Sequence, residues 1–585
     1  MAESIISPGV FSRENDISFI QPQPIAAGAA FLGPTVKGPV NQPTVITSYN
    51  EYVRKFGDTF LSASKSYEFL TSIAVKNYFS NGGQTALVTR VVTDGTYNGA
   101  VNTFLSASSI HTDEPFTIKT IGEGVAYNNA QASTSALVGG ASYINSDGSL
   151  VSGSKDNVRW EITNVNNDKG TFTLLVRQGD DSTNNKTILE TFNVDLDPNS
   201  PNYVERVVGN QTVVYDNVSS NKVVGEYPNR SNYIRVTAVK HPTPNYLKTD
   251  GISVNVDSNN ISYSASLPKA ASGSFTGATG TILGGANFFS SIGTSGNIQG
   301  LVAADYADAV NLLSNPDDFQ FNIISAPGLI NDNATNGASV LSDIVALAEE
   351  RGDCIAVVDL VATGSTASAV VAEAAAFNSS YAATYWPWVQ VQSATGQNVY
   401  VPAGTMIPGV FAFTDASSAP WFAPAGLVRG GIGGVIQAEK RLTKDERDTL
   451  YAGKVNPIAS FPGTGISVFG QKTLQTKASA LDRVNVRRLL IELKKFIGDQ
   501  ARNLVFEQNT IATRNKFLAT VNPYLESVVQ RQGLYAYRVV MDDSNNTADV
   551  VDRNQLVGQI FIQPAKTIEF VVLDFVIEPT GATFG

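Results

Sequence analysis

The pattern that most constrains the fold is a regular alternation of apolar strands and amphipathic helices between residues 319 and 392. The segments "FQFNIISAP" and "CIAVVDLV" are typical of buried strands, and "SVLSDIVALAEERG" lies between them. That middle segment predicts a helix with one apolar face, made of Val340, Leu341, Ile344, Val345 and Ala348. The helical pattern "ASAVVAEAAAF" and the strand pattern "TYWPWVQVQ" follow. Strands and helices that alternate in this way predict a parallel sheet with right-handed crossovers.

The same alternation occurs near the start of the sequence, between about residues 25 and 95. The segments "IAAGAAFLG" and "TALVTRVV" predict buried strands, and "SYNEYVRKFG" predicts a short helix that ends at Gly57. The segment "SYEFLTSIAVKNYF" predicts a second helix, with a stripe formed by Tyr67, Leu70, Ala74 and Tyr78. We therefore expect residues 21–95 and 301–475 to form one α/β domain.

The composition changes from about residue 96 to residue 300, where Ser, Thr, Asn and Gly dominate. The alternating runs "VRWEI" and "TFTLLV" flank the turn "NNDKG" and predict a β-hairpin. The runs "TILETFNVDL", "TVVYDN" and "YIRVTAV" continue the strand signal. Residues 96–300 are therefore predicted to be one or two β-rich domains, inserted into the α/β domain and placed on its outside.

Both ends of the sequence depart from the α/β pattern. Residues 1–20 form an extended arm, whose apolar side chains need a surface that the arm itself lacks. Residues 476–585 predict a long helix at about 484–508, a second helix interrupted at Asn522–Pro523, and three strands. The last strand contains "FVVLDFVI", which is apolar on both faces, as a central strand is. This C-terminal region is predicted to be an α+β unit.

The composition limits the classes of function. The formal charge of −11 and the pI near 4.9 oppose nucleic-acid binding, which needs a basic face. The single cysteine, Cys354, excludes an intrachain disulfide framework and fits a reducing compartment. We also expect no signal peptide, because the first residues lack a basic and then apolar segment, and no membrane span.

The sequence predicts no catalytic, cofactor or metal site. The two histidines, His111 and His241, occur in no ligand or catalytic-triad spacing, and Cys354 is expected to be a core residue. The tripeptide Arg351–Asp353 is interpreted as a helix end rather than an adhesion motif. The segments "GGIGG" and "GPTVKGP" lack the spacing of nucleotide-binding loops.

Two further groups of residues each allow two interpretations. The aromatic residues next to prolines are either a sugar platform or packing anchors, and the α/β context favours anchors for Trp386, Trp388, Trp421 and Phe422. The basic cluster on the predicted long helix is either a solvated face or a docking surface for an acidic partner. That cluster consists of Arg483, which precedes the helix, and of Arg487, Arg488, Lys494, Lys495 and Arg502 on it.

An ordered series of motifs resembles the tail sheath proteins of contractile phage tails. The N-terminal motifs are "SPGVF", "AAFLGPTVKGPVNQPTVITSYNEYVRKFG" and "AVKNYFSNGGQTALVTRVV". The later ones are "YWPWVQV", "VPAGTMIPGVFAFTDASSAPWFAPAG", "VNPIASFPGTGISVFGQKTL" and "RVNVRRLLIELKK", and the insertion adds "LETFNVDLDPNSPNYVERVVG". The resemblance covers most of the chain outside about 96–155 and 213–300. One departure is Tyr385–Trp386, where many members have two tyrosines.

This resemblance implies a multidomain α/β and α+β fold: a sheath core with a β-rich insertion, and terminal arms that complete a sheet shared between subunits. It implies self-assembly into stacked six-fold rings around an inner tail tube, and contraction that drives the tube through the host envelope. The other implied partners are the baseplate and tail terminator proteins; no cofactor, direct nucleic-acid contact or membrane insertion is implied. The protein would be located in the virion tail after assembly in the host cytoplasm.

The resemblance also implies roles for individual residues. The expected intersubunit linkers are Val10, Phe11, Ile17, Phe19, Ile568, Phe570, Val572 and Phe575. The basic cluster on the long helix is expected to face the tube.

Other classes remain as alternatives to the phage sheath. One is the sheath of a bacterial contractile injection particle. Another is a non-contractile surface protein with a sugar-binding β domain, which would require secretion and a free carbohydrate site. A hydrolase would require a catalytic constellation, which the sequence does not present.

Overall fold

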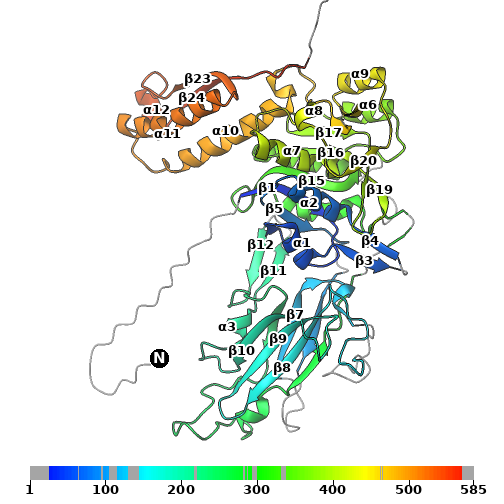
Figure 1. Ribbon diagram of the computed structural model, residues 1–585. Coiled ribbons are helices and arrows are strands. Elements are labelled where there is room, and N and C mark those ends of the chain that lie inside the picture. The colour runs from blue at the N-terminus through cyan, green and yellow to red at the C-terminus, as the bar shows by residue number, and fades with distance from the viewer. Residues whose placement is uncertain are drawn as a thin grey trace, which may run out of the picture.

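The chain has three parts that follow one another along an elongated molecule (Figure 1). An α/β core lies between a β-rich region, below it in the view, and a C-terminal unit that projects to one side at the top. The structure, a computed structural model, describes residues 26–62, 65–93, 97–104, 115–129, 144–216, 220–280, 284–285, 287–290, 292, 299–330, 337–461, 463 and 465–569.

An eight-stranded sheet forms the centre of the core. Its strands, in spatial order, are β2 (Thr44–Ile46), β5 (Ala86–Arg90), β1 (Ala26–Gly33), β15 (Gln320–Ile330), β16 (Ile355–Asp359), β17 (Ala382–Trp386), β21 (Asn456–Phe461) and β22 (Gly465–Val468). The six strands from β5 to β21 are parallel, which confirms the predicted parallel sheet. Strands β1 and β15 are direct neighbours, with Ala29 opposite Ile323, so segments on both sides of the β-rich region form one sheet.

Helices cover both faces of this sheet. One face packs against α2 (Leu70–Ser80) and α7 (Ile407–Ser417), and the other against α5 (Gly337–Arg351), α6 (Ala367–Ala375) and α9 (Lys444–Ala452). Neighbouring residues in a strand point to opposite faces. Ile323 therefore packs in the apolar cluster under α2 and α7, and Ile324 in the one under α5, α6 and α9. The predicted apolar face of α5 is buried in the cluster that α5 shares with α6 and α9, as the periodicity indicated.

Local chemistry explains where α1 (Tyr49–Phe56) begins and ends. The Ser48 hydroxyl accepts a hydrogen bond from the Glu51 N–H at 3.2 Å, which satisfies one of the free amides at the start of the helix. Gly57 follows the helix with φ at 74°, a conformation that favours glycine. The predicted end of this helix at Gly57 is confirmed.

Two boundaries in the core differ from the predictions. Tyr67 lies in β4 (Lys65–Glu68), which pairs with β3 (Thr59–Ser62), rather than in α2. Its ring is part of an aromatic cluster with Phe60 and Phe288, and this packing outweighs the helical pattern. The segment predicted as one strand over 384–392 is two strands, β17 and β18 (Val389–Gln392), because Pro387 between them has no N–H to donate.

The β-rich region forms three separate sheets, and the four-stranded and three-stranded ones share one apolar core. Strands β8 (Val158–Asn166) and β9 (Thr171–Gln178) pair antiparallel, which confirms the predicted hairpin. They form a four-stranded sheet with β10 (Ile188–Asp195) and β14 (Ala271–Ser274). The other two sheets contain β6 (Gly99–Thr103), β7 (Phe116–Glu123) and β13 (Ile234–Val239), and β11 (Thr212–Asp216) and β12 (Ser220–Val224).

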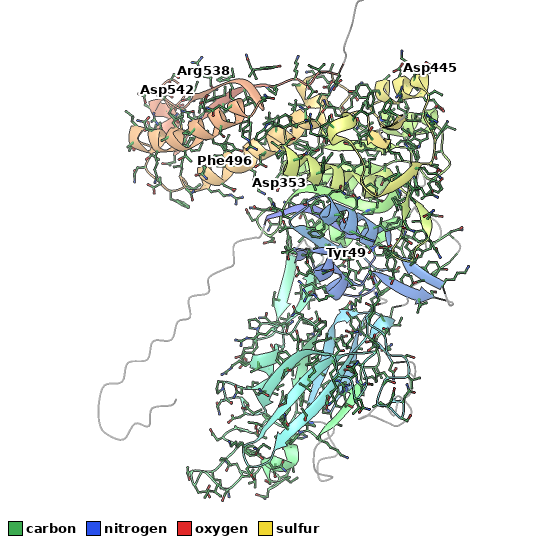
Figure 2. The ribbon with its side chains drawn as sticks, in the orientation of Figure 1. Tyr49, Asp353, Asp445, Phe496, Arg538 and Asp542 are labelled. Atoms are coloured by element: carbon green, nitrogen blue, oxygen red, sulfur yellow. The ribbon has the colours of Figure 1, made fainter. Side chains whose placement is uncertain are left out.

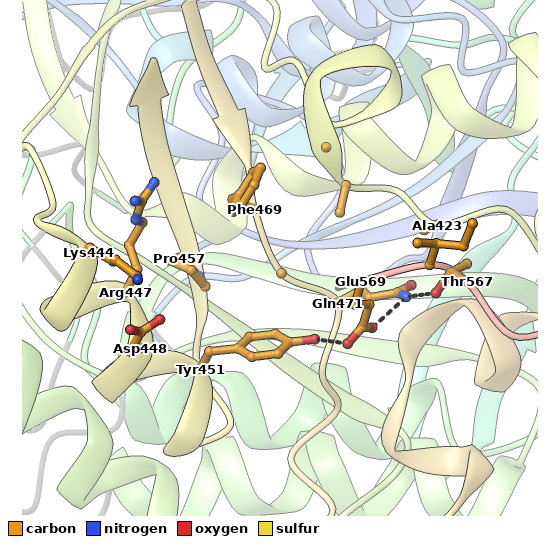
Figure 3. A pocket seen from close by; sticks show the side chains of 14 residues that line it. Ala423, Lys444, Arg447, Asp448, Tyr451, Pro457, Phe469, Gln471, Thr567 and Glu569 are labelled. Carbon is orange, nitrogen blue, oxygen red and sulfur yellow. Dashed lines mark hydrogen bonds between the residues drawn. The ribbon is translucent and has the colours of Figure 1, made fainter. Parts of the chain in front are cut away.

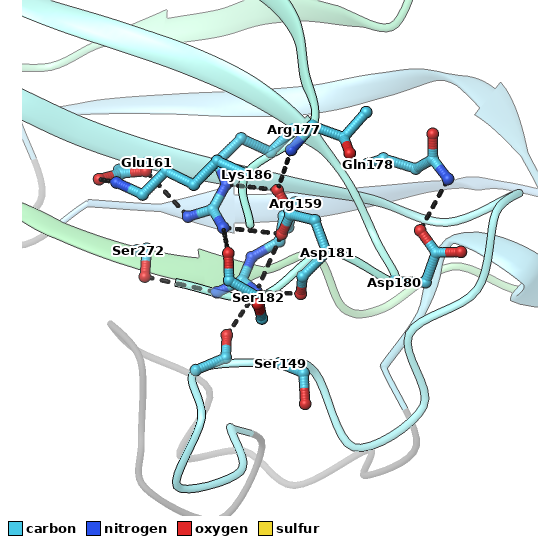
Figure 4. Close-up of polar contacts among 12 residues, drawn as sticks. Ser149, Arg159, Glu161, Arg177, Gln178, Asp180, Asp181, Ser182, Lys186 and Ser272 are labelled. Carbon is cyan, nitrogen blue, oxygen red and sulfur yellow. Dashed lines mark hydrogen bonds and ion pairs between the residues drawn. The ribbon is translucent and has the colours of Figure 1, made fainter. Parts of the chain in front are cut away.

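A buried ionic network crosses the four-stranded sheet (Figure 4). The Asp181 carboxylate accepts bonds from the Arg177 Nε and Nη2 atoms, both at 2.7 Å, and lies 3.3 Å from Nη1 of Arg159. Arg177 also pairs with Glu161 at 2.8 Å. The side chains of Arg159, Arg177 and Asp181 are at most 1% exposed. Because each charge has partners, the network fixes the turn after β9 on the sheet.

The β-rich region leaves and re-enters the core at one place. The Thr93 hydroxyl donates a hydrogen bond at 2.8 Å to the carbonyl of Gly300, which lies 207 residues later. Beside this point, the fully buried Arg90 guanidinium donates to the carbonyls of Gly38 and Glu123, at 2.6 and 2.7 Å. These contacts join the strand β5 of the core to the strand β7 of the β-rich region.

The C-terminal unit, residues 484–564, contains α10 (Val484–Arg502), α11 (Ile511–Gln530), β23 (Leu534–Val540), α12 (Ala548–Asp552) and β24 (Gln559–Pro564). Helix α10 ends at Arg502, before the predicted end near 508. The predicted interruption at Asn522–Pro523 is wrong, because α11 continues through Pro523. The packing of α11 on α10, which includes Phe496 stacked on Tyr524 at 3.7 Å between ring centroids, holds the helix across the missing amide. Figure 2 labels Phe496.

Candidate functional site

The two-stranded sheet of the C-terminal unit presents one face to solvent. Its inner face packs on α10 and α11 through Tyr537, Val539, Ile560 and Ile562. On its outer face Tyr535 is 66% exposed and Phe561 is 56% exposed. A register shift between Leu534 and Ala536 accounts for the different surroundings of Tyr535 and Tyr537, which are only two residues apart.

Both lateral edges of this sheet are open within the described residues, because β23 and β24 pair only with each other there. A two-stranded sheet is marginally stable by itself, and an open strand edge is a template for another strand. The β23–β24 sheet is therefore suited to accept strands from outside, as are the two other two-stranded sheets among the described residues, β3–β4 and β11–β12.

Most of the predicted linker residues lie outside the described residues. These are Val10, Phe11, Ile17, Phe19, Phe570, Val572 and Phe575. Ile568 is described and is 84% exposed, with no core packing of its own. The third predicted strand of the C-terminal region likewise falls largely beyond residue 569, and Lys566–Glu569 are not part of a strand.

A pocket of about 360 Å³ lies where the chain leaves the core after the C-terminal unit (Figure 3). Its apolar lining includes Ala423, Pro457, Phe469 and Ile568. The Arg447 guanidinium stands over the Phe469 ring, 5.8 Å from its centroid. The pocket therefore combines apolar walls with a cationic rim.

A carboxylate clamp closes one side of this pocket, and three side chains hold Glu569; Figure 3 shows two of them, Gln471 and Tyr451. Arg483 donates from Nε and Nη2 to the two carboxylate oxygens at 2.7 and 3.0 Å. Gln471 Nε2 donates at 3.0 Å and the Tyr451 hydroxyl at 2.8 Å. Burial by itself raises the pKa of Glu569, but the bonds from Arg483, Gln471 and Tyr451 outweigh it and hold that pKa below its usual value. We call these four residues the Glu569 clamp.

The sequence analysis missed the Glu569 clamp. Its four residues are widely separated in the sequence, and no spacing connects them. The available signal was a single carboxylate at the start of the apolar run "TIEFVVLDFVI", since a charged group in such a run needs a partner.

The structure divides the basic cluster of α10 into two groups. Arg487 is 4% exposed, and its guanidinium lies over the Tyr381 ring at 3.9 Å. Arg488 is 5% exposed and donates to the carboxylate of Asp415 on α7. Both arginines are thus occupied inside the chain, because they fix α10 to the core.

The remaining basic residues lie further along α10. Lys494 is exposed, and its ammonium donates to the Tyr381 hydroxyl at 3.0 Å. Lys495 lies 3.5 Å from Asn322 Oδ1. Arg502 pairs with Asp317 at 2.9 Å, and both of these side chains are more than half exposed. Exposed pairs of this kind exchange partners at little cost.

The aromatic residues next to prolines are packed rather than displayed. Trp386, Trp388 and Trp421 are 1%, 2% and 6% exposed, and Phe422 is partly buried in the C-terminal cluster. The Trp421 indole donates to the carbonyl of Arg531 at 3.0 Å. Trp421 therefore joins the core to the C-terminal unit and leaves no open ring face for a sugar.

The cysteine and the Arg351–Asp353 tripeptide have structural roles. Cys354 is fully buried, and burial raises the pKa of its thiol. The Arg351 side chain is 0% exposed and is paired with Asp353 at 2.8 Å, as in a structural turn. His111 lies outside the described residues.

The described part of the chain contains neither a cluster of metal-ligating side chains nor a helix that could span a membrane. None of its clusters of His, Cys, Asp or Glu reaches the three residues that a metal site would need. Nor does any helix there combine the length and apolar character required to cross a bilayer.

Comparison with known proteins gives matches over two adjacent regions. The sequence model of the family described as phage tail sheath protein central domain matches residues 299–474, and that of the phage tail sheath C-terminal domain matches residues 476–578. The tail sheath protein of Vibrio phage KVP40 is 43% identical over 188 residues, which are 32% of this chain and 28% of that protein. The tail sheath protein of Enterobacteria phage T4 is 32% identical over 310 residues, which are 50% of this chain and 47% of that protein. The chain thus spans less than half the length of these relatives.

The fold is also similar to a solved structure. The crystal structure of a sheath tail protein from Listeria innocua has a TM-score of 0.50 and 11% identity, over 92% of this chain and 95% of that protein. At this identity the likeness concerns the fold alone. The sequence of this chain is thus similar to phage tail sheath proteins over residues 299–578, and its fold is similar to that of a sheath tail protein over most of the chain.

Proposed function

We propose that this protein is the structural subunit of a contractile phage tail sheath. In this proposal it polymerises as stacked six-fold rings around an inner tail tube, and the rings contract to drive the tube through the host envelope. The observation that carries the proposal is the combination of the family matches over 299–578 with an open two-stranded sheet inside the matched region. The role is mechanical and involves no catalysis.

The arms supply the strands that the open sheet lacks. Residues 1–20 of one subunit and 566–578 of another add to the edges of β23 and β24 in a third subunit. The exposed Tyr535 and Phe561 suit such an addition, because side chains of an added strand would pack beside them on the same face. An exchange of this kind is head-to-tail, and head-to-tail contacts generate open helical assemblies.

The C-terminal unit faces the tube, and the β-rich region faces outward. Because Arg487 and Arg488 are engaged with the core, the contacts to the tube come from the exposed part of the cluster, at Lys494, Lys495 and Arg502. These side chains hold weak, replaceable partners, which suits a contact that has to release during contraction. The baseplate and the tail terminator would contact the ends of the assembled sheath, inside the host cytoplasm and then in the virion.

Electron microscopy of the purified protein tests this proposal. The full chain should form tubular polymers, and a variant lacking 1–20 or 570–585 should stay monomeric with an unchanged circular dichroism spectrum. A Tyr535→Ser variant should also fail to polymerise, because its outer sheet face is altered. Monodisperse globules from the full chain, or normal tubes from both truncated variants, would refute it.

A further inference from the structure

The Glu569 clamp closes the C-terminal unit into a loop. Arg483 immediately precedes α10, and Glu569 follows β24 by five residues, so the clamp joins positions that are 86 residues apart. The whole C-terminal unit lies between the two clamped positions. The ion pair is only partly accessible, with side-chain exposures of 25% for Arg483 and 18% for Glu569.

Three segments of the chain meet at this clamp. The Gln471 carbonyl accepts a hydrogen bond from the N–H of Val484, the first residue of α10, at 2.8 Å. The Gln471 side chain donates to Glu569 and to the hydroxyl of Thr567. Tyr451 reaches the same carboxylate from the end of α9. The core, the start of α10 and the root of the C-terminal arm are therefore fastened at one joint.

Without the clamp, a force on the arm would pull β24 away from β23 from the end of the strand pair, which is the direction of least mechanical resistance. The arm continues from β24, and the end of β24 at Pro564 lies opposite Leu534, the first residue of β23. A force on that end would separate the two strands one bond at a time. In the clamp, by contrast, the two bonds from Arg483 and those from Gln471 and Tyr451 hold a single carboxylate and are loaded together.

We propose that Glu569 is a positioning residue that fastens the C-terminal arm to the core, so that tension in the arm enters the core at Arg483 and Tyr451 and bypasses residues 484–564. This inference rests on the proposed function, in which the arm connects neighbouring subunits. It gives the C-terminal unit a way to keep its fold, and its position against a partner, while the arm is under tension.

Single-molecule pulling of the full chain tests the proposal. One handle is attached at Leu61→Cys, an exposed position of β3, which labels cleanly because the native Cys354 is fully buried. The other handle is attached at the C-terminus. Unfolding of the unit between the clamped residues should lengthen the chain by about 300 Å, at about 3.3–3.6 Å per residue. The readout is the lifetime at constant force before this step.

We expect Glu569→Gln to shorten that lifetime about tenfold, because the charge-assisted bonds to Arg483 are lost. Arg483→Lys keeps the charge without the two-pronged geometry and should give a smaller decrease. Glu507→Gln removes the same charge from an exposed position in the C-terminal unit and should leave the lifetime unchanged. Without load, hydrogen exchange of α10 and α11 should be equal in all four proteins.

Two results would overturn the proposal. One is a Glu569→Gln lifetime within twofold of the original protein. The other is loss of amide protection in α10 and α11 of Glu569→Gln without load, since Glu569 would then be part of the fold rather than a fastening. The measurement uses single subunits, so it is independent of polymerisation. Failure to form tubes would refute the sheath function and leave this result interpretable.

Discussion

The core sheet and the β23–β24 sheet represent opposite solutions to the problem of a strand edge. The central strands β16 and β17 of the core are buried at every position, and helices cover both faces of the sheet. In β24, exposed and half-buried residues alternate, and both edges of its sheet are open within the described residues. The difference is that the central strands of the core are covered within one chain, whereas the β23–β24 sheet leaves one face and both edges uncovered within the described residues.

The largest effect should come from a cavity in the complete sheet. Trp386 is 1% exposed at the end of β17, so Trp386→Ala removes a large buried side chain. We expect the free energy of unfolding to fall by about 3–5 kcal/mol, measured by urea denaturation. The control is Val428→Ala, at a position that is 82% exposed, which should change it by less than about 0.5 kcal/mol. A loss below about 1 kcal/mol for Trp386→Ala would mean that the core sheet is not better packed than the β23–β24 sheet.

An intermediate effect should appear as a pH dependence of the folding stability, caused by a buried carboxyl group in the core. Asp359, at the end of β16, is buried and accepts one bond from the Gly404 N–H at 2.8 Å; burial raises its pKa from 3.8 to about 7. Between these values the folded protein keeps a proton that the unfolded chain loses, so this group lowers stability as the pH rises from about 4 to about 7, by up to about 1.4 kcal/mol per pH unit.

Asp359→Asn should remove this slope, as measured by thermal unfolding across that pH window. Glu373→Gln, at a residue of α6, provides a comparison of the same charge change in a helix. A slope that persists in Asp359→Asn would assign the dependence to another group.

The smallest effect on stability should come from the outer face of the open sheet. Tyr535→Ser should change the free energy of unfolding by less than about 0.5 kcal/mol, because Tyr535 is 66% exposed. Tyr537→Ser is the matched control on the inner face, where the hydroxyl donates to the carbonyl of Asn522 at 3.1 Å, and it should cost about 1–3 kcal/mol. Equal costs for the two variants would show that the outer face is as well packed as the inner one, against the comparison.

The two sheets also differ in how well the sequence predicts them. In the core, continuous apolar strands and 3.6-residue periodicity predicted β15, α5, β16 and α6 and their parallel order, because burial on both faces leaves a strong pattern. In the C-terminal unit the local signals were weaker. Pro523 predicted a break that the packing of α11 on α10 prevents, and the register shift at Tyr535 has no signature in the sequence.

Contacts between distant residues explain the remaining differences. The arginines of α10 follow a spacing typical of a solvated or docking face, but Asp415 and Tyr381 come from remote segments to bury Arg487 and Arg488. The Glu569 clamp depends in the same way on residues from separate elements. Charged residues in a single sequence show that a partner is needed, but they do not identify it.

The contact between Thr93 and Gly300 has an evolutionary consequence. Because the β-rich region begins and ends at one hydrogen bond, it is a cassette that can be exchanged or lost in a single recombination event without changing the order of strands in the core. A replacement would have to supply a backbone carbonyl for Arg90, a carboxylate for Lys37, which now pairs with Asp156 at 3.1 Å, and apolar side chains in place of Phe288 and Ile292. The β-rich region can therefore differ between related chains while the order of strands in the core is kept.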